Sequence, residues 1–155
     1  MVQRDDTPWH YYQAKGWLYT QLGNPEVSGV YIDSAVTLLT AAALENPEDG
    51  HPHIDLATIY GWLGRKDAAI REWRRGIELN PLANDPVNGW AHVLALAATY
   101  TQFGEYDAAV EQLDRVLSIP SLVSSPLLRV DPLWAPLRSN PRFQALLAKY
   151  DKPPR

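Results

Sequence analysis

The residues of this chain that could do chemistry are few, and the most suggestive are two histidines. His51 and His53 are separated by one proline, and imidazole nitrogens are common ligands of zinc. Two side chains that are two positions apart at the start of a helix point in different directions, and the sequence fixes no third ligand. We therefore expect no metal and no cofactor, and we interpret the pair as the start of a helix.

Catalytic motifs are missing from the rest of the sequence. The chain has no cysteine, which excludes disulfides, thiolate zinc sites and cysteine nucleophiles. It also lacks a glycine-rich phosphate loop, a Gly-x-Ser-x-Gly elbow and a His-Glu-x-x-His motif. We expect a protein that is not an enzyme and that acts by binding.

Composition limits the class of partner. The 155 residues are 46% hydrophobic and 21% charged, as in a folded domain or a short repeat array. A formal net charge of -4 provides no positive field for nucleic acid or for an anionic membrane, and we expect neither as a partner. The amino terminus lacks a secretory hydrophobic region, and the longest nearly apolar run, Ala35 to Leu44, is about half a membrane span. We expect a cytoplasmic location, with the periplasm as the alternative if the chain is part of a longer protein.

The elements that would position a binding surface follow an internal repeat of 34 residues, with two insertions. The steps between the repeated small, aromatic and proline positions fit two helices joined by a tight turn. The positions are Gly16, Tyr19, Gly23, Ala35, Leu39, Ala42 and Pro47; then Ala57, Tyr60, Gly64, Ala69, Trp73, Gly76 and Pro81; then Ala97, Tyr100, Gly104, Ala109, Leu113, Val116 and Pro120.

This pattern resembles the tetratricopeptide repeat, and the resemblance covers about two thirds of the chain. It implies an all-α fold, a right-handed α-solenoid of three helix pairs with a helical cap at the carboxy-terminal end. Small residues beside large ones also let paired helices approach closely, which supports the same arrangement. We expect helix pairs at about 8–47, 50–83 and 84–121 within residues 1–122, capping helices at 123–150 and a disordered tail at 151–155.

Glycine and proline mark the ends of these helices. Gly23, Gly64 and Gly104 each follow an apolar run, where a left-handed residue closes a helix. Pro47 and Pro81 close the second helices, because proline cannot continue the helical hydrogen bonds.

The two insertions are interpreted differently. Asn84-Asp85-Pro86 combines a capping residue with a proline of the first turn, which predicts a long helix at about 86–103. The insertion at 24–33 has turn-forming ends, and we expect a loop packed on the surface, with Asp33 or Ser34 capping the next helix.

The final stretch of the chain does not repeat. The pairs Ser125-Pro126, Asp131-Pro132 and Asn140-Pro141 are typical of the starts of short helices. The string from Ser125 to Leu147 resembles the segment that closes tetratricopeptide regions of bacterial signalling proteins, in which the array follows a cyclase, a serine/threonine kinase or a winged-helix regulator. We expect its apolar residues to cover the open end of the array. These are Leu127, Leu128, Leu133, Trp134, Leu137, Phe143, Leu146 and Leu147.

The resemblance implies that a peptide or protein segment binds in the concave groove lined by the first helix of each pair. Trp17 and Trp62 are the candidate hot spots for a partner with apolar or aromatic anchors. The alternative is that both tryptophans pack against neighbouring helices or the 24–33 insertion. The candidate groove residues are Gln13, Trp17, Thr20, Gln21, His51, Ile54, Asp55, Thr58, Trp62, Leu94, Ala98, Thr101 and Gln102, with His10 beside them.

Similar repeats that hold the acidic tails of chaperones use lysine, arginine and asparagine as paired donors. This chain has other residues at the matching places, and we predict no such clamp. Those residues are Gln13, Trp17, Asp55, Ala91 and Ala95.

Two further clusters have a structural and a functional interpretation. The basic residues Arg65, Lys66, Arg71, Arg74 and Arg75 could meet an acidic partner, but we favour a solvated face paired with Asp67, Glu72 and Glu78. The aromatic string from Trp9 to Tyr12 resembles a stacking strip for nucleic acid, yet it lacks surrounding positive charge. We expect that string to cover the amino-terminal end of the array.

Three functions are consistent with this interpretation. The first is a protein-interaction or scaffold module that binds a peptide or protein in the groove. The second is a regulatory or spacing domain of a larger bacterial signalling protein. The third is weak self-association through an exposed end of the array.

Overall fold

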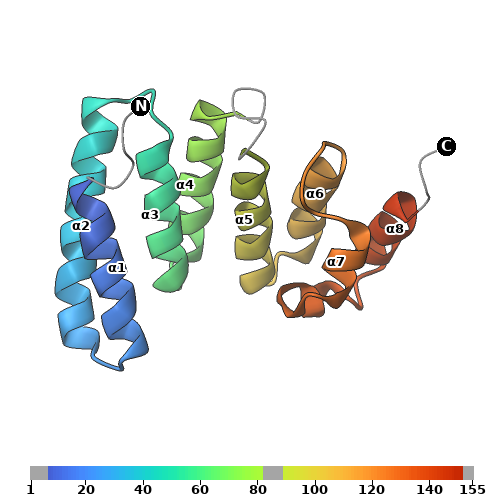
Figure 1. The fold of residues 1–155 in the computed structure, drawn as a ribbon, viewed down its shortest axis with the longest axis horizontal. Coiled ribbons are helices and arrows are strands. Elements are labelled where there is room, and N and C mark those ends of the chain that lie inside the picture. Colours follow the sequence, from blue (N-terminus) through green and yellow to red (C-terminus); the bar gives the residue numbers. More distant parts are fainter. Residues whose placement is uncertain (1–6, 82–88, 152–155) are drawn as a thin grey trace. The chain divides into compact units, whose positions relative to one another are not determined.

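The computed structural model describes residues 7–81 and 89–151, and all regular secondary structure in these ranges is helical, which confirms the all-α prediction. Contacts divide the chain into two compact units, Met1–Leu79 and Asn80–Arg155. Unit 1 contains α1 (Pro8–Gln21), α2 (Pro25–Glu45), α3 (His51–Trp62) and α4 (Lys66–Leu79) (Figure 1). Unit 2 contains α5 (Gly89–Gln102), α6 (Tyr106–Leu117), α7 (Ser125–Val130), the 3-10 helix η2 (Pro132–Leu137) and α8 (Pro141–Tyr150).

Three helices end at the glycines that the sequence indicates. Gly23, Gly64 and Gly104 have φ angles of 69°, 69° and 77°, in the left-handed region where a side chain would be strained. After each glycine, the next backbone N–H donates back to the helix, as from Asn24 to the Tyr19 carbonyl at 2.9 Å. The same turn therefore follows α1, α3 and α5.

The predicted surface loop at 24–33 is wrong, because α2 begins at Pro25. The side chain of Asn24 caps this helix by accepting the Val27 N–H at 3.3 Å. Neither Asp33 nor Ser34 caps a helix, since both lie inside α2.

Burial explains why the insertion is helical. The buried residues of α2 recur every three or four positions from the insertion into the second half of the helix, so they form one continuous stripe. A loop would have taken the first two of them out of the core. The stripe consists of Ser28, Ile32, Ala35 and Leu39.

The paired helices of unit 1 pack through glycines. A Cβ atom on Gly16 of α1 would lie 2.6 Å from Ile32 Cγ1 of α2, and a Cβ on Gly76 of α4 would lie 2.6 Å from Ile54 Cγ1 of α3. Only a residue without a side chain permits these approaches. The core between the two pairs is formed by Ile32, Ala35, Leu39, Leu56 and Ile59, with Trp9, Tyr12, Val36 and Tyr60 packed against it.

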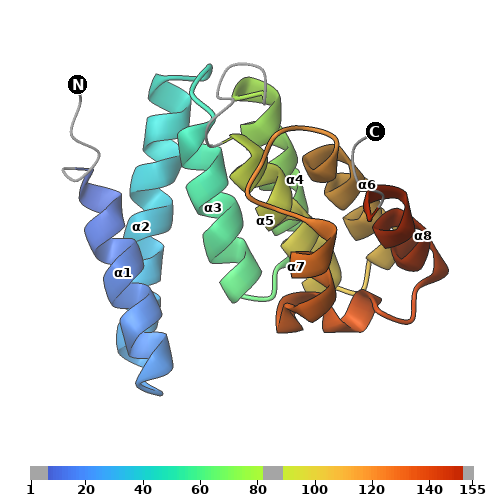
Figure 2. The same ribbon diagram turned by 45° about the vertical axis from the view of Figure 1, so that its right-hand side comes forward.

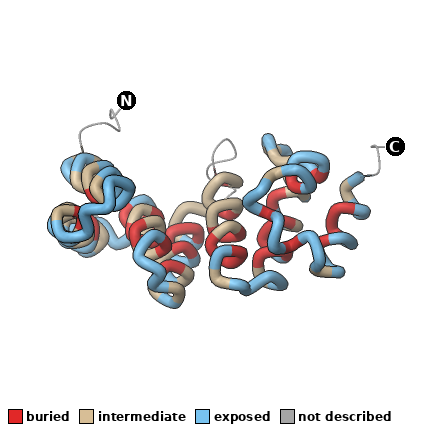
Figure 3. The backbone as a smooth tube through the Cα atoms, turned by 90° about the horizontal axis from the view of Figure 1, so that it is seen from below, coloured by how far each residue is buried: buried red, intermediate tan, exposed pale blue. Residues whose placement is uncertain are grey.

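In unit 2, α5 and α6 form a third pair around buried small residues. Ala97 and Ala109 are fully buried, with Tyr100 and Leu113 beside them in the core. Figure 3 colours the backbone by burial, and buried residues recur along the helices that it draws. The first described residue of α5 is Gly89, so the predicted helix start at 86 lies outside the described residues.

The carboxy-terminal segment folds as the short helices that its prolines predict. Asp131 accepts the Leu133 N–H at 2.9 Å, and Asn140 accepts the Arg142 N–H at 2.8 Å, so a polar residue caps both η2 and α8. The segment η2 is a 3-10 helix with Pro136 inside it, and proline there has no backbone N–H to donate to an α-helical bond. The helix α8 packs on α6 and on α7, and η2 packs on α5 (Figure 2).

Burial in this segment differs from the prediction at two leucines. Leu127 and Leu133 are 47% and 49% exposed, because each short helix buries only one face. The other six predicted residues are buried: Leu128, Trp134, Leu137, Phe143, Leu146 and Leu147.

The predicted disordered tail at 151–155 starts one residue too early. Asp151 accepts hydrogen bonds from Ser125 and Arg129 of α7, which lower the pKa of its carboxyl group. The remaining residues of that prediction, 152–155, lie outside the described residues.

By length and composition, α2 would fit a membrane span, and it does so alone among the helices that the structure describes. Core helices of soluble proteins meet the same criteria, and a single such helix is weak support for a membrane segment. In α2 that buried stripe is narrow, because 22% of the apolar window is buried in this structure.

Candidate functional site

The candidate site is the face of unit 1 formed by the outward residues of α1 and α3. On α1, Gln13, Trp17 and Gln21 recur every four residues, so they lie on one line along the helix. On α3, Asp55, Thr58 and Trp62 recur at intervals of three and four residues. We call these six residues the α1/α3 face.

Both candidate tryptophans are accessible. Trp17 is 48% exposed and Trp62 is 44% exposed, so about half of each indole meets solvent. Neither indole is fully buried, and the 24–33 segment, which was one alternative cover for them, is part of α2. A large aromatic side chain held half-open on a helix is typical of a binding hot spot.

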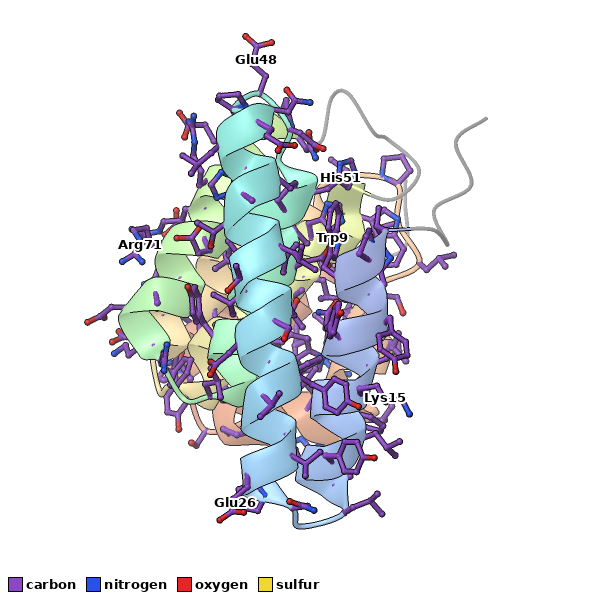
Figure 4. The ribbon with its side chains drawn as sticks, turned by 90° about the vertical axis from the view of Figure 1, so that its left-hand side faces the viewer. Trp9, Lys15, Glu26, Glu48, His51 and Arg71 are labelled. Atoms are coloured by element: carbon purple, nitrogen blue, oxygen red, sulfur yellow. The ribbon has the colours of Figure 1, made fainter. Side chains whose placement is uncertain are left out.

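A carboxylate joins the two helices near their amino-terminal ends. Trp9 Nε1 on α1 donates to Asp55 Oδ2 on α3 at 3.1 Å, and His10 Nε2 lies 3.5 Å from the same oxygen. His10 Nδ1 in turn lies 2.7 Å from the Thr7 hydroxyl. Figure 4 shows Trp9 and His51 at this end of unit 1.

Burial raises the pKa of the Asp55 carboxyl group, and the nearby His10 and the hydrogen bond from Trp9 act in the opposite direction. The group is therefore a partly desolvated anchor for α1 on α3. Because Asp55 Oδ2 accepts from Trp9, Asp55 positions α1 on α3.

The contact at Asp55 fixes the relative height of the two tryptophans. The helices α1 and α3 run in the same direction (Figure 1). Trp17 follows Trp9 by about 12 Å along its helix, and Trp62 follows Asp55 by about 10.5 Å, at 1.5 Å per residue. Since Trp9 meets Asp55, the two indoles lie at similar heights on neighbouring helices.

The helices of the α1/α3 face carry almost no formal charge. Lys15 is the one charged side chain of α1 and Asp55 that of α3, apart from histidines. The corresponding helix of unit 2, α5, has none. In contrast, α4 contains seven acidic or basic residues in fourteen positions. The face therefore offers aromatic, hydroxyl and amide groups and has little capacity to bind an ionic ligand.

Two of the predicted groove residues are buried. Ile54 is 9% exposed and packs against Gly76 of α4, so it belongs to the helix-pair contact. Thr101 is 5% exposed, and its hydroxyl donates to the Ala97 carbonyl of its own helix at 2.9 Å. Helical phase alone misplaced both, because each position borders the buried stripe of its helix.

The other candidates are divided between the two compact units. The α1 and α3 residues lie together in unit 1, whereas Leu94, Ala98 and Gln102 lie on α5 in unit 2. Exposed candidates are Trp17, Thr20, Gln21, His51, Trp62 and Gln102. Half-buried candidates are His10, Gln13, Asp55, Thr58, Leu94 and Ala98, and the clamp positions Ala91 and Ala95 are also half-buried.

The two histidines of the possible metal motif have different carboxylate neighbours. His51 Nδ1 lies 2.7 Å from Asp49 Oδ1, and His53 Nδ1 lies 2.7 Å from Glu72 Oε2 on α4. Within residues 7–81 and 89–151, no three histidine or acidic side chains come close enough together to hold a metal ion. The helix α3 begins at His51, as predicted.

Two arginines of the basic cluster form ion pairs with carboxylates of α4. Arg71 Nε lies 3.3 Å from Glu72 Oε1, and Arg75 Nη1 lies 3.0 Å from Glu78 Oε2. Both arginines stay exposed, so these are solvated surface pairs of small energetic value.

Sequence reasoning missed the bond between Trp9 and Asp55. The two residues are 46 positions apart, and no local pattern pairs them. An available signal was that Asp55 is the one acidic residue in an otherwise uncharged helix, which requires a partner when it is partly buried.

Neither the known family models nor the curated proteins match this chain. The assignment of a function therefore depends on the geometry described above.

Proposed function

We propose that this protein is a tetratricopeptide-like interaction module that binds a peptide or protein segment on the α1/α3 face, with no catalysis. In this proposal the three helix pairs stack as a right-handed solenoid, and the carboxy-terminal helices cap it. The repeated glycine turns after α1, α3 and α5 and the fully buried alanines of each pair support the repeat.

The observation that carries the proposal is the pair of half-exposed tryptophans, Trp17 and Trp62, at similar heights on neighbouring helices. Exposing two indoles to water is unfavourable, and covering them with an apolar or aromatic side chain of a partner would recover that free energy. The adjacent Gln13 and Gln21 carboxamides could bind polar groups of the same segment.

The scarcity of charge on these helices defines the chemistry of the partner. Charged contacts are the ones that salt screens, and the α1/α3 face has few of them to offer. We expect a partner segment with apolar or aromatic anchors and an affinity that changes little with salt. An acidic tail that binds at micromolar concentration and dissociates in salt would contradict this expectation.

The test is capture of partners from a lysate of the source organism with immobilised protein. Trp62→Ala should lose the specific partners, because truncating a hot spot costs about 2 kcal/mol, or roughly thirtyfold in affinity. Leu44→Ala is the matched control: Leu44 is an apolar side chain of α2 in the same unit, 76% exposed and outside the face. Circular dichroism would verify that both variants fold.

The control should capture the same proteins as the unmodified chain. If Trp62→Ala captures them equally well, or if nothing specific is captured at all, the α1/α3 face is not the binding surface.

A regulatory or spacing role in a larger signalling protein is the second candidate. It is favoured by the string from Ser125 to Leu147, which resembles the closing segment of such proteins and folds as α7, η2 and α8. The natural open reading frame tests it, since this role requires a cyclase, kinase or winged-helix domain in the same chain.

A further inference from the structure

A cluster of four tyrosines covers the side of the α1–α2 pair that is remote from the α1/α3 face. Tyr19 and Tyr31 stack with their centroids 5.6 Å apart and their planes inclined by 6°. The ring centroids of Tyr11 and Tyr12 each lie 6.3 Å from that of Tyr31, and they lie 5.3 Å from one another. We call these four residues the tyrosine face.

This surface is distinct from the proposed binding site. Tyr11, Lys15 and Tyr19 recur every four residues along α1, whereas Trp17 is two positions from Lys15. Two positions correspond to about 200° of rotation, so Lys15 and Trp17 lie on nearly opposite sides of the helix. Figure 4 views unit 1 with α1 and α2 in front and with Lys15 labelled on α1.

The rings are held in place before any partner binds. Tyr31 contacts all three other tyrosines, and the ammonium group of Lys15 lies 5.9 Å from the Tyr11 ring centroid. Tyr11 nevertheless remains 57% exposed. A rigid aromatic residue that is ordered but uncovered loses little conformational entropy on binding.

A hollow of about 380 Å³ lies beside Tyr12, whose ring centroid is 5.3 Å from that of the exposed Tyr11. It is lined by Tyr12 of α1 and by Asp33, Ser34, Thr37 and Leu38 of α2. A projecting tyrosine and a hollow therefore lie on the same helix pair. Because both lie on one surface, two copies related by a two-fold axis can present this surface to each other.

The charges near the hollow are also self-complementary. Lys15 is positive and follows Tyr11 by one helical turn, whereas Asp33 is negative and borders the hollow. In the part of the chain that the structure describes, neither side chain forms an ion pair. Both are available to a second molecule.

We propose that a second copy of this chain docks on the tyrosine face in a two-fold arrangement. Tyr11 of each copy enters the hollow of the other, and Lys15 of each copy then lies beside Asp33 of the other. Burying the four rings supplies the apolar part of the association, and the two ion pairs set the orientation. The α1/α3 face stays accessible on both copies.

Sedimentation equilibrium over a range of protein concentrations tests this proposal. The unmodified chain should show a monomer–dimer equilibrium. Lys15→Asp alone and Asp33→Lys alone should each weaken the dimer at least tenfold, because each places like charges opposite one another at both contacts. An equimolar mixture of the two variants should restore the dimer, since both pairs are then again of opposite sign.

The matched control is Glu111→Lys, which reverses an exposed acidic side chain of α6 in unit 2. It should leave the dimer unchanged, as should Trp62→Ala, whose effect belongs to the proposed function. A chain that is monomeric up to about 1 mM, the weak end of specific association, would overturn the proposal. A dimer that is insensitive to both charge reversals, or a mixture that stays monomeric, would also overturn it.

Discussion

At the scale of single residues, two glycines in helices of unit 1 have opposite surroundings. A Cβ on Gly76 would lie 2.6 Å from Ile54 Cγ1 and 3.1 Å from the Gly50 carbonyl, whereas a Cβ on Gly29 would meet nothing within 4 Å. Gly76→Ala should therefore destabilise the protein by about 1–3 kcal/mol through overpacking. Gly29→Ala should stabilise it by about 0.5–1 kcal/mol, since alanine is the better helix former. Urea denaturation of both variants measures the change in the free energy of unfolding. Changes of the same sign in the two variants would contradict the close helix contact at Gly76.

Asp55 gives a prediction about pH. Burial raises its pKa above the ordinary 3.8, so the folded state holds this proton more tightly than the unfolded state does. The contribution of Asp55 to stability is therefore favourable below pH 3.8 and is lost as pH rises through the raised pKa. Asp55→Asn removes this dependence of stability on pH and keeps an acceptor for Trp9. The variant should therefore gain in stability relative to the unmodified chain as pH rises from 3.8.

Asp55→Ala is the comparison, because it leaves the Trp9 N–H without an acceptor. It should cost about 1–3 kcal/mol at neutral pH. Denaturation of the three proteins in parallel at several pH values separates the hydrogen bond from the charge. If Asp55→Asn and Asp55→Ala change the free energy of unfolding equally at neutral pH, the hydrogen bond from Trp9 to Asp55 does not hold α1 on α3.

Residue patterns predicted the small core positions better than the surface ones. Ala57 and Ala69 are fully buried, because only a small side chain fits where two helices cross at that spacing. Ile54 and Thr101 were predicted to face the groove but are buried. A residue at the border of the buried stripe becomes buried or exposed with only a small rotation of the helix. The exposure of Trp17 was one of two alternatives left open by the sequence, because it depends on what the rest of the chain leaves uncovered.

At the scale of elements, α2 shows where local reasoning failed. Asn24-Pro25 is a cap followed by proline, the same signal that correctly marks α8 at Asn140-Pro141. The repeat spacing marks 24–33 as an insertion, and its turn-forming ends predicted a surface loop in place of a helix. The helix formed because Ser28 and Ile32 continue its buried stripe, and a Gly16 without a side chain lets α1 approach them.

The helix α8 provides a prediction about the two compact units. Phe143 is fully buried on α8, which packs on α6 and α7. Phe143→Ala should therefore cost about 3–5 kcal/mol, and the loss should fall mainly on unit 2. Hydrogen exchange with mass spectrometry should show faster exchange in α5 to α8 and little change in α1 to α4.

The control for this element is Leu122→Ala, which removes an apolar side chain of unit 2 that is 82% exposed. It should alter stability by less than about 0.5 kcal/mol. Equal loss of protection in both units after Phe143→Ala would mean that the chain unfolds as one cooperative body.

At the scale of the whole molecule, the sequence predicted the helical class and the main helix boundaries. The left-handed residues Gly23, Gly64 and Gly104 explain this success, because such residues and the prolines act locally and do not depend on the rest of the fold. The tyrosine face and the contact between Trp9 and Asp55 could not be predicted, since each joins residues from different helices. A binding surface is therefore the part of this protein for which three-dimensional structure adds most.

The claim that the α1/α3 face binds another polypeptide is tested most directly by calorimetric titration. A partner captured by the unmodified chain would be titrated into that chain and into Trp62→Ala at low and at high salt. We predict an affinity that varies little with salt and that falls roughly thirtyfold in the variant. Equal affinities for the two proteins, or binding that is lost in salt, would contradict the claim.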